Sequence, residues 1–195
     1  MNATDPGRRP DPYAMLLYAG AFGAAVANTV TDLPTVRILE LTSDATPPEA
    51  IASASVVVLV APQTYHRQRM ELCRWLREAS RPLGHIELFA SHLRIGPTDT
   101  PGQACYGCLA TKTMRLNEPD AVSWDAGATP EGYAQAHVAM AAGFTRQLFA
   151  DPDAFVGRLV DYDFQFGVFR PVGLLREDTC PICRLQPVSD HPEEN

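Results

Sequence analysis

Two C-x-x-C pairs constrain the fold of this chain more than any other feature of its sequence. The first pair is Cys105 and Cys108 in PGQACYGCLATK, and the second is Cys180 and Cys183 in EDTCPICRLQ. The C-x-x-C spacing lets two thiolates reach one tetrahedral ion from a tight turn, so two pairs supply the four sulfurs of a closed zinc site. Because a long stretch separates the pairs, such a site must join distant segments of the chain.

The four cysteines allow four interpretations: a metal site, two redox dithiols, a disulfide framework, or unrelated buried cysteines. The chain has five cysteines, an odd number, and its polar, proline-broken start lacks the apolar core of a signal peptide. We therefore expect a cytoplasmic protein, in which disulfides are rare. A redox C-x-x-C usually opens a helix after a strand, and the sequence suggests that setting for neither pair.

Structural zinc is therefore the favoured interpretation of the four cysteines. Gly107 lies inside the first pair and Pro181 inside the second, as suits a metal-binding knuckle. Four thiolates leave no open coordination position, so we do not expect this zinc to be catalytic. The fifth cysteine, Cys73, lies in the helical pattern MELCRWLREAS and is predicted to be a small buried hydrophobe.

Composition narrows the partners that the chain could bind. At 195 residues it suits one domain, and its net charge of −7 argues against binding nucleic acid or an anionic membrane surface. No apolar run approaches the roughly 20 residues that span a bilayer. We expect neither a nucleic-acid partner nor a membrane partner.

The order of apolar segments predicts a doubly wound, mainly parallel α/β sheet of the Rossmann-like type. SVVVLVAP at 55–62 is apolar without alternation, which is typical of a central strand covered on both faces. The further predicted strands are 14–20, 35–44 and one or two within 84–97, and the predicted helices are 21–33, 47–54, 64–80 and 132–150.

The last part of the chain follows a different pattern. Residues 156–173 alternate apolar and polar side chains, which predicts an antiparallel extension of the sheet. We expect one domain over 14–185, with disordered tails at 1–13 and 186–195.

A glycine-containing turn follows the first predicted strand in YAGAFGAAVA. Gly20 and Gly23 could cradle a phosphate at the start of a helix, or they could simply permit a tight turn and close helix–strand packing. Past the second strand, Glu40 or Asp44 could meet a ribose, although neither forms a convincing acidic fingerprint.

Other candidate site residues carry weaker signals. His66 follows the strongest strand, where a doubly wound sheet forms its ligand crevice, and it is either a functional histidine or a capping residue. Three neighbours of His66 could bind an anionic group: Tyr65, Arg67 and Arg69. His85 and His92 are expected to be packing residues, and Asp161 and Asp163 to share the solvated side of a strand. The sequence assigns no catalytic residue.

The segment RIGPTDTPGQACYGCL, followed much later by CPIC, resembles the ubiquitin-activating-enzyme-like fold of the ThiF and MoeB type. More narrowly, it resembles the ThiF-like cyclodehydratase partner proteins of azole-modified ribosomal peptides, over residues 14–185. The resemblance implies one structural zinc bound by the four cysteines. It also implies a partner, either a YcaO-type modifying enzyme or the leader of a precursor peptide, and assembly as a homodimer or heteromer.

Several departures from this family imply that ATP use and adenylation have been lost. The third glycine of the nucleotide loop is missing, and LTSDATPPEAIASAS replaces the arginine-bearing segment and lysine of active members. Active members keep an aspartate after the central strand, where this chain reads APQTYHR. The stretch before the first strand is also too short for the leader-binding winged helix of many relatives.

The sequence and the family resemblance leave three candidate functions to be tested. The first is a non-adenylating accessory subunit of a peptide-modifying complex. The second is an active ATP-dependent adenylating enzyme acting on a peptide or carrier-protein C-terminus. The third is an NAD(P)-dependent oxidoreductase, suggested only by the strand–glycine–helix order.

Overall fold

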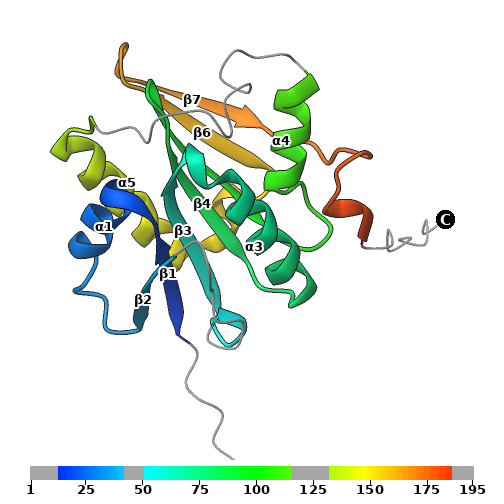
Figure 1. The fold of residues 1–195 in the computed structure, drawn as a ribbon, viewed down its shortest axis with the longest axis horizontal. Coiled ribbons are helices and arrows are strands. Elements are labelled where there is room, and N and C mark those ends of the chain that lie inside the picture. Colours follow the sequence, from blue (N-terminus) through cyan, green and yellow to red (C-terminus); the bar gives the residue numbers. More distant parts are fainter. Residues whose placement is uncertain (1–12, 42–50, 116–131, 186–195) are drawn as a thin grey trace, which may run out of the picture.

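The computed structural model describes residues 13–41, 51–115 and 132–185, and it arranges them as a seven-stranded sheet with helices on both faces (Figure 1). The strand order is β2-β1-β3-β4-β5-β6-β7. The strands are β1 (Ala14–Tyr18), β2 (Val36–Glu40), β3 (Val56–Pro62), β4 (Leu83–Leu88), β5 (His92–Asp99), β6 (Arg158–Asp163) and β7 (Val168–Gly173).

The sheet has a parallel half and an antiparallel half. Strands β1 to β4 pair in parallel, whereas β4–β5, β5–β6 and β6–β7 pair antiparallel. The predicted α/β fold is therefore confirmed for the core, where the strands are parallel, whereas the sheet as a whole is mixed rather than mainly parallel. The region predicted to hold one or two strands at 84–97 forms two antiparallel ones, and the predicted extension at 156–173 is the β6–β7 hairpin.

Helices α3 (His66–Glu78) and α4 (Tyr106–Arg115) cover one face of the sheet, and α1 (Gly20–Thr29) and α5 (Gln135–Ala150) cover the other (Figure 1). Short 3₁₀ turns lie at Gln63–Tyr65, Pro152–Phe155 and Cys183–Leu185. Among the residues that the structure describes, no helix has the length and apolar character needed to cross a bilayer.

Strand β3 is the centre of the core, and every one of its residues is buried. Because successive side chains of a strand point to opposite faces, Val57 and Leu59 pack under α3 and α4, whereas Val58 and Val60 pack under α1 and α5. The continuous apolar run at 55–62 thus reflects a strand with two covered faces, as predicted.

Some sequence predictions differ from the structure or lie outside it. Helix α4 is not among the predicted helices, because the sequence indicated only a tight turn and a metal-binding knuckle in its segment. The first cysteine pair therefore does open a helix after a strand, contrary to the expectation from sequence. Tyr13, assigned to the tail, is buried, and its carbonyl accepts a 2.8 Å hydrogen bond from the Ser55 amide. Residues 1–12, 186–195 and the first half of the predicted helix 47–54, residues 47–50, lie outside the described residues, and the boundaries 14–185 stay a prediction.

Candidate metal centre

The structure brings the two C-x-x-C pairs together at one buried cluster of four thiols. The sulfur of Cys105 lies 3.9 Å from that of Cys108, 3.7 Å from that of Cys180 and 3.6 Å from that of Cys183. The sulfurs of Cys108 and Cys183 are 3.4 Å apart. The four thiols, two from the start of α4 and two from the segment after β7, therefore form one compact cluster.

These separations match the geometry of a tetrahedral zinc site. With Zn–S bonds of about 2.3 Å, the edges of a regular ZnS₄ tetrahedron are about 3.8 Å long. A disulfide needs sulfurs only about 2.05 Å apart, which is far shorter than any distance in the cluster. The geometry thus fits a four-cysteine metal site and does not fit bonded disulfides or a single isolated dithiol.

Local structure fixes the first pair at the start of α4. The amide of Tyr106, between the two cysteines, donates a 2.7 Å hydrogen bond to Oδ1 of Asp99 at the end of β5. A carboxylate at this position satisfies a helix-terminal amide and interacts favourably with the helix dipole. Asp99 thereby sets the direction in which Cys105 and Cys108 project.

The second pair closes over the first with little free space. A Cβ added to Gly107 would lie 2.9 Å from the Cys180 sulfur and 2.9 Å from Cδ1 of Ile182. Backbone amides also point at sulfur: that of Glu177 lies 3.4 Å from the Cys108 sulfur, and that of Cys183 lies 3.5 Å from the Cys180 sulfur. Such contacts orient and stabilise thiolate ligands.

The thiols influence one another's protonation. A hydrogen bond from Cys105 lowers the pKa of Cys108 far below its ordinary value and lowers that of Cys180 to about 7. The hydrogen bond to Cys108 conversely raises the pKa of Cys105. The pKa of Cys183 is raised as well, because its hydrogen bonds to Cys108 and Cys180 outweigh the lowering effect of Cys105. Two thiols are therefore shifted toward the thiolate and two away from it, and a bound dication would favour the thiolate form of all four.

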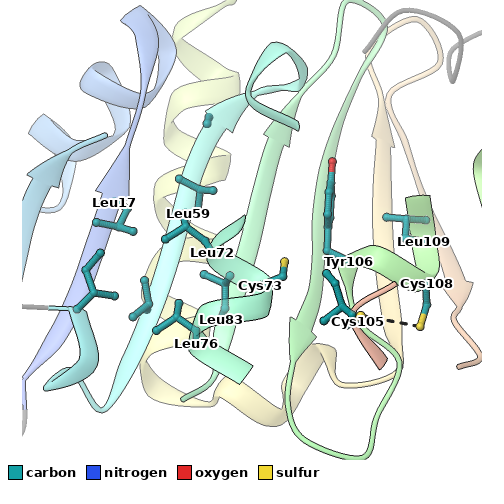
Figure 2. Close-up of a cluster of buried hydrophobic side chains, with 14 of the residues drawn as sticks. Leu17, Leu59, Leu72, Cys73, Leu76, Leu83, Cys105, Tyr106, Cys108 and Leu109 are labelled. Atoms are coloured by element: carbon teal, nitrogen blue, oxygen red, sulfur yellow. Dashed lines mark hydrogen bonds between the residues drawn. The ribbon is translucent and has the colours of Figure 1, made fainter. Parts of the chain in front are cut away.

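A second group of potential ligands lies beside the first on the same face of the sheet. Cys73, His85 and Asp99 are all buried and place a sulfur, a ring nitrogen and a carboxylate oxygen close together. The His85 Nε2 atom is 3.7 Å from the Cys73 sulfur and 3.1 Å from Asp99 Oδ2. Figure 2 shows Cys73 on α3, near Tyr106 and Cys105.

Hydrogen bonding argues that this second group is not a metal site. Arg69 can only donate, and its Nη1 lies 3.4 Å from His85 Nδ1, so Nδ1 accepts and Nε2 carries the proton toward Asp99. Nε2 would have to lose this proton to bind a metal, and the Arg69 cation 3.4 Å from Nδ1 disfavours a second cation at this place. Burial also raises the pKa of the Cys73 thiol, which stays neutral. The predicted burial of Cys73 is confirmed, although its neighbours are polar.

Arg69 is the centre of this buried polar cluster. Its Nη2 donates to the carbonyls of Ala61 at 2.6 Å and Ile86 at 3.0 Å, and its Nε lies 3.4 Å from Oε1 of Glu87. The guanidinium is 0% exposed. Arg69 therefore ties the carboxyl ends of β3 and β4 together. The sequence suggested that it could bind an anionic group, and in the structure its guanidinium lies against the buried carboxylate of Glu87.

Tyr106 connects this cluster to the thiols and to the strand ends. Figure 2 shows its ring extending along the sheet, away from the sulfurs of Cys105 and Cys108. Its hydroxyl donates to Glu87 Oε1 at 2.9 Å and lies 3.3 Å from His66 Nδ1. His66 is thus half-buried and held by Tyr106, at the position after β3 where sequence placed it.

Sequence reasoning missed the roles of Glu87, Asp99 and Tyr106. The signal that could have revealed them is charge within strands: GHIEL places His85 and Glu87 at alternate positions of a strand that is otherwise apolar. Charged residues are almost never fully buried unless they are paired, so such a strand predicts a basic partner on the covering helix.

The two glycines of the candidate nucleotide loop have structural explanations. Gly20 adopts a φ of 68°, in the left-handed region, where the chain turns from β1 into α1. A Cβ on Gly23 would lie 2.7 Å from the Val60 carbonyl and 3.1 Å from Cβ of Tyr18. Both glycines are therefore required by the turn and by helix–strand packing, whatever ligand lies nearby.

The remaining predicted residues serve the antiparallel half of the sheet. His92 stacks on Phe89 with ring centroids 4.1 Å apart, as expected of a packing residue. Asp161 accepts two hydrogen bonds from Arg94, at 2.8 and 3.1 Å, so it is held in a partly buried ion pair rather than freely solvated. Asp163 pairs with Arg170 at 3.1 Å.

No protein-family model and no curated protein matches the sequence. Solved structures do match the fold. The heterocyclase TruD superposes with a TM-score of 0.58 at 15% identity, over 88% of this chain and 27% of TruD. A chain of the E. coli microcin synthetase McbBCD complex gives 0.63 at 10% identity, over 92% and 71%. E. coli MccB with succinimide gives 0.54 at 12% identity, over 89% and 67%.

These similarities establish the fold. This chain spans about a quarter of the length of the heterocyclase chains that it matches, with 25% and 27% covered in the two cases. At such low identity, the activities of those proteins are not transferred with the architecture.

Proposed function

We propose that this chain is an accessory, ThiF-like subunit of a ribosomal-peptide-modifying complex of the YcaO cyclodehydratase type. The observation that carries the proposal is the joint occurrence of two features. One is a fold shared with heterocyclase and microcin synthetase chains, and the other is a buried four-cysteine cluster placed where the family resemblance puts its zinc. The subunit contacts the modifying enzyme, the precursor peptide or both.

In this proposal Cys105, Cys108, Cys180 and Cys183 hold one structural Zn²⁺, which fastens the segment after β7 to the start of α4. Metal content by mass spectrometry should give one zinc per chain. Cys180→Ser should lose the metal and lower the free energy of unfolding by several kcal/mol, because metal binding is coupled to folding. Cys73→Ser is the matched control and should keep one zinc. Full zinc in the Cys180 variant would refute the ligand assignment.

The proposal also holds that the subunit does not adenylate. Gly20 and Gly23 are accounted for by the turn and by packing. Active members of the family keep an aspartate after the central strand, where this chain has Ala61 and Pro62, and the ring of Pro62 lies 3.6 Å from a Cβ built on Gly20. The glycine turn is therefore bordered by the apolar ring of Pro62 rather than by a carboxylate that could bind a metal.

The second candidate function is an active adenylating enzyme. One arrangement favours it: α1 begins directly after β1, and Glu40 ends the neighbouring parallel strand, level with Tyr18. This is where an α/β sheet binds a nucleotide. An ATP–pyrophosphate exchange assay with the zinc-loaded protein separates the two functions. We expect no exchange, and exchange that Glu40→Ala abolishes would instead support the enzyme.

The partner is tested by purification from the native host. A tagged chain should retain a YcaO-type enzyme through a high-salt wash, and mass spectrometry of the retained proteins identifies it. Reconstitution should then show that azoline formation, measured as loss of one water from the precursor peptide, requires the accessory chain. Azoline formation at an unchanged rate without the chain would contradict the accessory role.

A further inference from the structure

A row of three hydrogen-bonded side chains runs from the core to the carboxyl end of β3. Its members come from three elements: Glu87 from β4, Tyr106 from α4 and His66 from the first position of α3. The Tyr106 hydroxyl lies 2.9 Å from Oε1 of Glu87 and 3.3 Å from Nδ1 of His66. Glu87 and Tyr106 are fully buried, whereas His66 is half-buried. The row therefore connects a buried carboxylate to a partly exposed imidazole ring.

Tyr106 has one hydroxyl proton, and the position of that proton decides how the row is oriented. Both Glu87 and His66 are within its reach. Among the residues that the structure describes, Oε2 of Glu87 has no hydrogen-bond partner, and Oε1 lies 3.4 Å from Nε of Arg69. A buried carboxylate that accepts too few hydrogen bonds is costly, so the proton is directed to Glu87. The tyrosine oxygen is then an acceptor, and Nδ1 of His66 must donate a proton to it.

The row thereby fixes the tautomer of His66. A neutral imidazole with its proton on Nδ1 has a lone pair on Nε2. Because the two nitrogens point to different sides of the ring, Nε2 is directed away from the Tyr106 hydroxyl. The backbone is held as well, since the His66 amide donates to the Gln63 carbonyl in the 3₁₀ turn before α3. A hydrogen bond that sets the tautomer in this way is typical of histidines that bind or react through the other nitrogen.

His66 lies at the edge of the sheet where α/β proteins bind ligands. Strands β1 and β3 are neighbours although β2 lies between them in the sequence, so the strand order reverses at this point. Ligands of such sheets bind outside the carboxyl ends of the strands at this switch point. Pro62 ends β3 there, its ring lies beside Gly20 at the start of α1, and His66 follows after a single 3₁₀ turn.

We propose that Nε2 of His66 binds a peptide at this switch point by accepting a hydrogen bond from a neutral O–H, S–H or N–H group. The lone pair on Nε2 repels an anionic oxygen. A cationic donor is disfavoured too, because α3 starts with HRQR, which contains arginines and no acid, and the helix dipole adds positive charge at the same place. Glu87 and Tyr106 are positioning residues. That the ligand is a peptide rests on the proposed function, whereas the tautomer and the preference for a neutral donor do not.

Nitrogen NMR of the histidine rings tests the tautomer directly. In isotope-labelled, zinc-loaded protein at alkaline pH, where histidine is neutral, the ring correlations of His66 should show a protonated Nδ1 and an unprotonated Nε2. Tyr106→Phe removes the acceptor and should shift His66 toward the tautomer with its proton on Nε2, which free histidine prefers. Tyr162→Phe, on β6, is the matched control and should leave the His66 signals unchanged. A proton on Nε2 in the unchanged protein would overturn the proposal.

Two small probes test the chemistry of the ligand. N-acetylserine N-methylamide carries neutral O–H and N–H donors, whereas N-acetylproline N,N-dimethylamide carries none. We expect the first probe to shift the Nε2 resonance of His66 upfield in a saturable way, and the second to leave it unchanged. An equal response to both probes, or no saturable response to the first, would overturn the proposal.

Two variants of His66 separate the role of Nε2 from that of the ring as a whole. The side-chain oxygen of His66→Gln can reach the position of Nε2 and accept the same hydrogen bond, whereas His66→Asn is too short to do so. Followed by the backbone amide shifts of residues 63–65, the affinity for the serine probe should be kept by His66→Gln and fall by about two- to tenfold in His66→Asn. Equal affinity in the two variants would contradict the assignment of Nε2. Azoline formation that requires the chain, together with a failed probe titration, would show that this inference is wrong while the proposed function holds.

Discussion

Replacing Gly107 by alanine tests how the two cysteine pairs pack around the proposed zinc, without changing any of the four ligands. Gly107 lies within α4, and its φ is not in the left-handed region. In an open helix the change would stabilise the protein by up to about 1 kcal/mol, because alanine is the better helix former. Here the added Cβ would lie 2.9 Å from both the Cys180 sulfur and Cδ1 of Ile182, which is closer than ordinary van der Waals contact.

The size of the effect depends on which neighbour can move. The end of the Ile182 side chain can rotate, but the Cys180 sulfur is fixed once it is bonded to a metal. Overpacking of this kind typically costs about 1–3 kcal/mol, which outweighs the gain in helix propensity. We expect Gly107→Ala to lower the free energy of unfolding by about 1–2 kcal/mol, which is a drop in Tm of about 2–8 °C for a chain of this size.

The assay is urea denaturation of the zinc-loaded protein, with Gly143→Ala as the matched control. Gly143 lies in α5, is exposed, and has nothing within 4 Å of a built Cβ. Its replacement should raise stability by up to about 1 kcal/mol. If Gly107→Ala is as stabilising as Gly143→Ala while zinc is bound, then the Cys180–Cys183 segment does not pack against α4. The described arrangement of the two cysteine pairs would then be wrong.

Three further predictions concern the metal and the cluster beside it. Removing zinc with a strong chelator should lower Tm and release one equivalent of metal, measured with a colorimetric zinc indicator, and re-addition should restore both. Arg69→Met should cost about 3–5 kcal/mol in urea denaturation, because it leaves Glu87 buried without its cation; the double variant with Glu87→Leu should recover part of that loss, and additive losses would contradict the coupling. Asp99→Asn should cost about 1–3 kcal/mol, because an amide group facing His85 sets two donors against each other, whereas an unchanged stability would mean that His85 Nε2 is not the donor.

The parallel core could be predicted because its signals are local. The run at 55–62 has no polar residue to place outward, so only a strand covered on both faces suits it, and β3 is that strand. The four-cysteine cluster was also predictable from spacing, because C-x-x-C restricts how two sulfurs can point. Neither inference needed knowledge of which segments become neighbours.

Helix α4 and the buried arginine could not be predicted in this way. The carboxylate that holds the first turn of α4 belongs to Asp99, seven positions before the amide of Tyr106, so the usual adjacent capping residue is missing. Arg69 sits between exposed polar positions of α3 and resembles a solvated residue. Its burial depends on carbonyls and a carboxylate from β3 and β4, which the helix sequence does not contain.

The position of the second cysteine pair has a consequence for the order of events during folding. Cys180 and Cys183 follow β7, so the chain between the two pairs includes α5 and the whole β6–β7 hairpin. A metal ion captured early by Cys105 and Cys108 would be held by two bonds only and exchange readily. Full capture must wait until that intervening chain has folded back onto α4, so tight retention of the ion reports that the sheet has been completed.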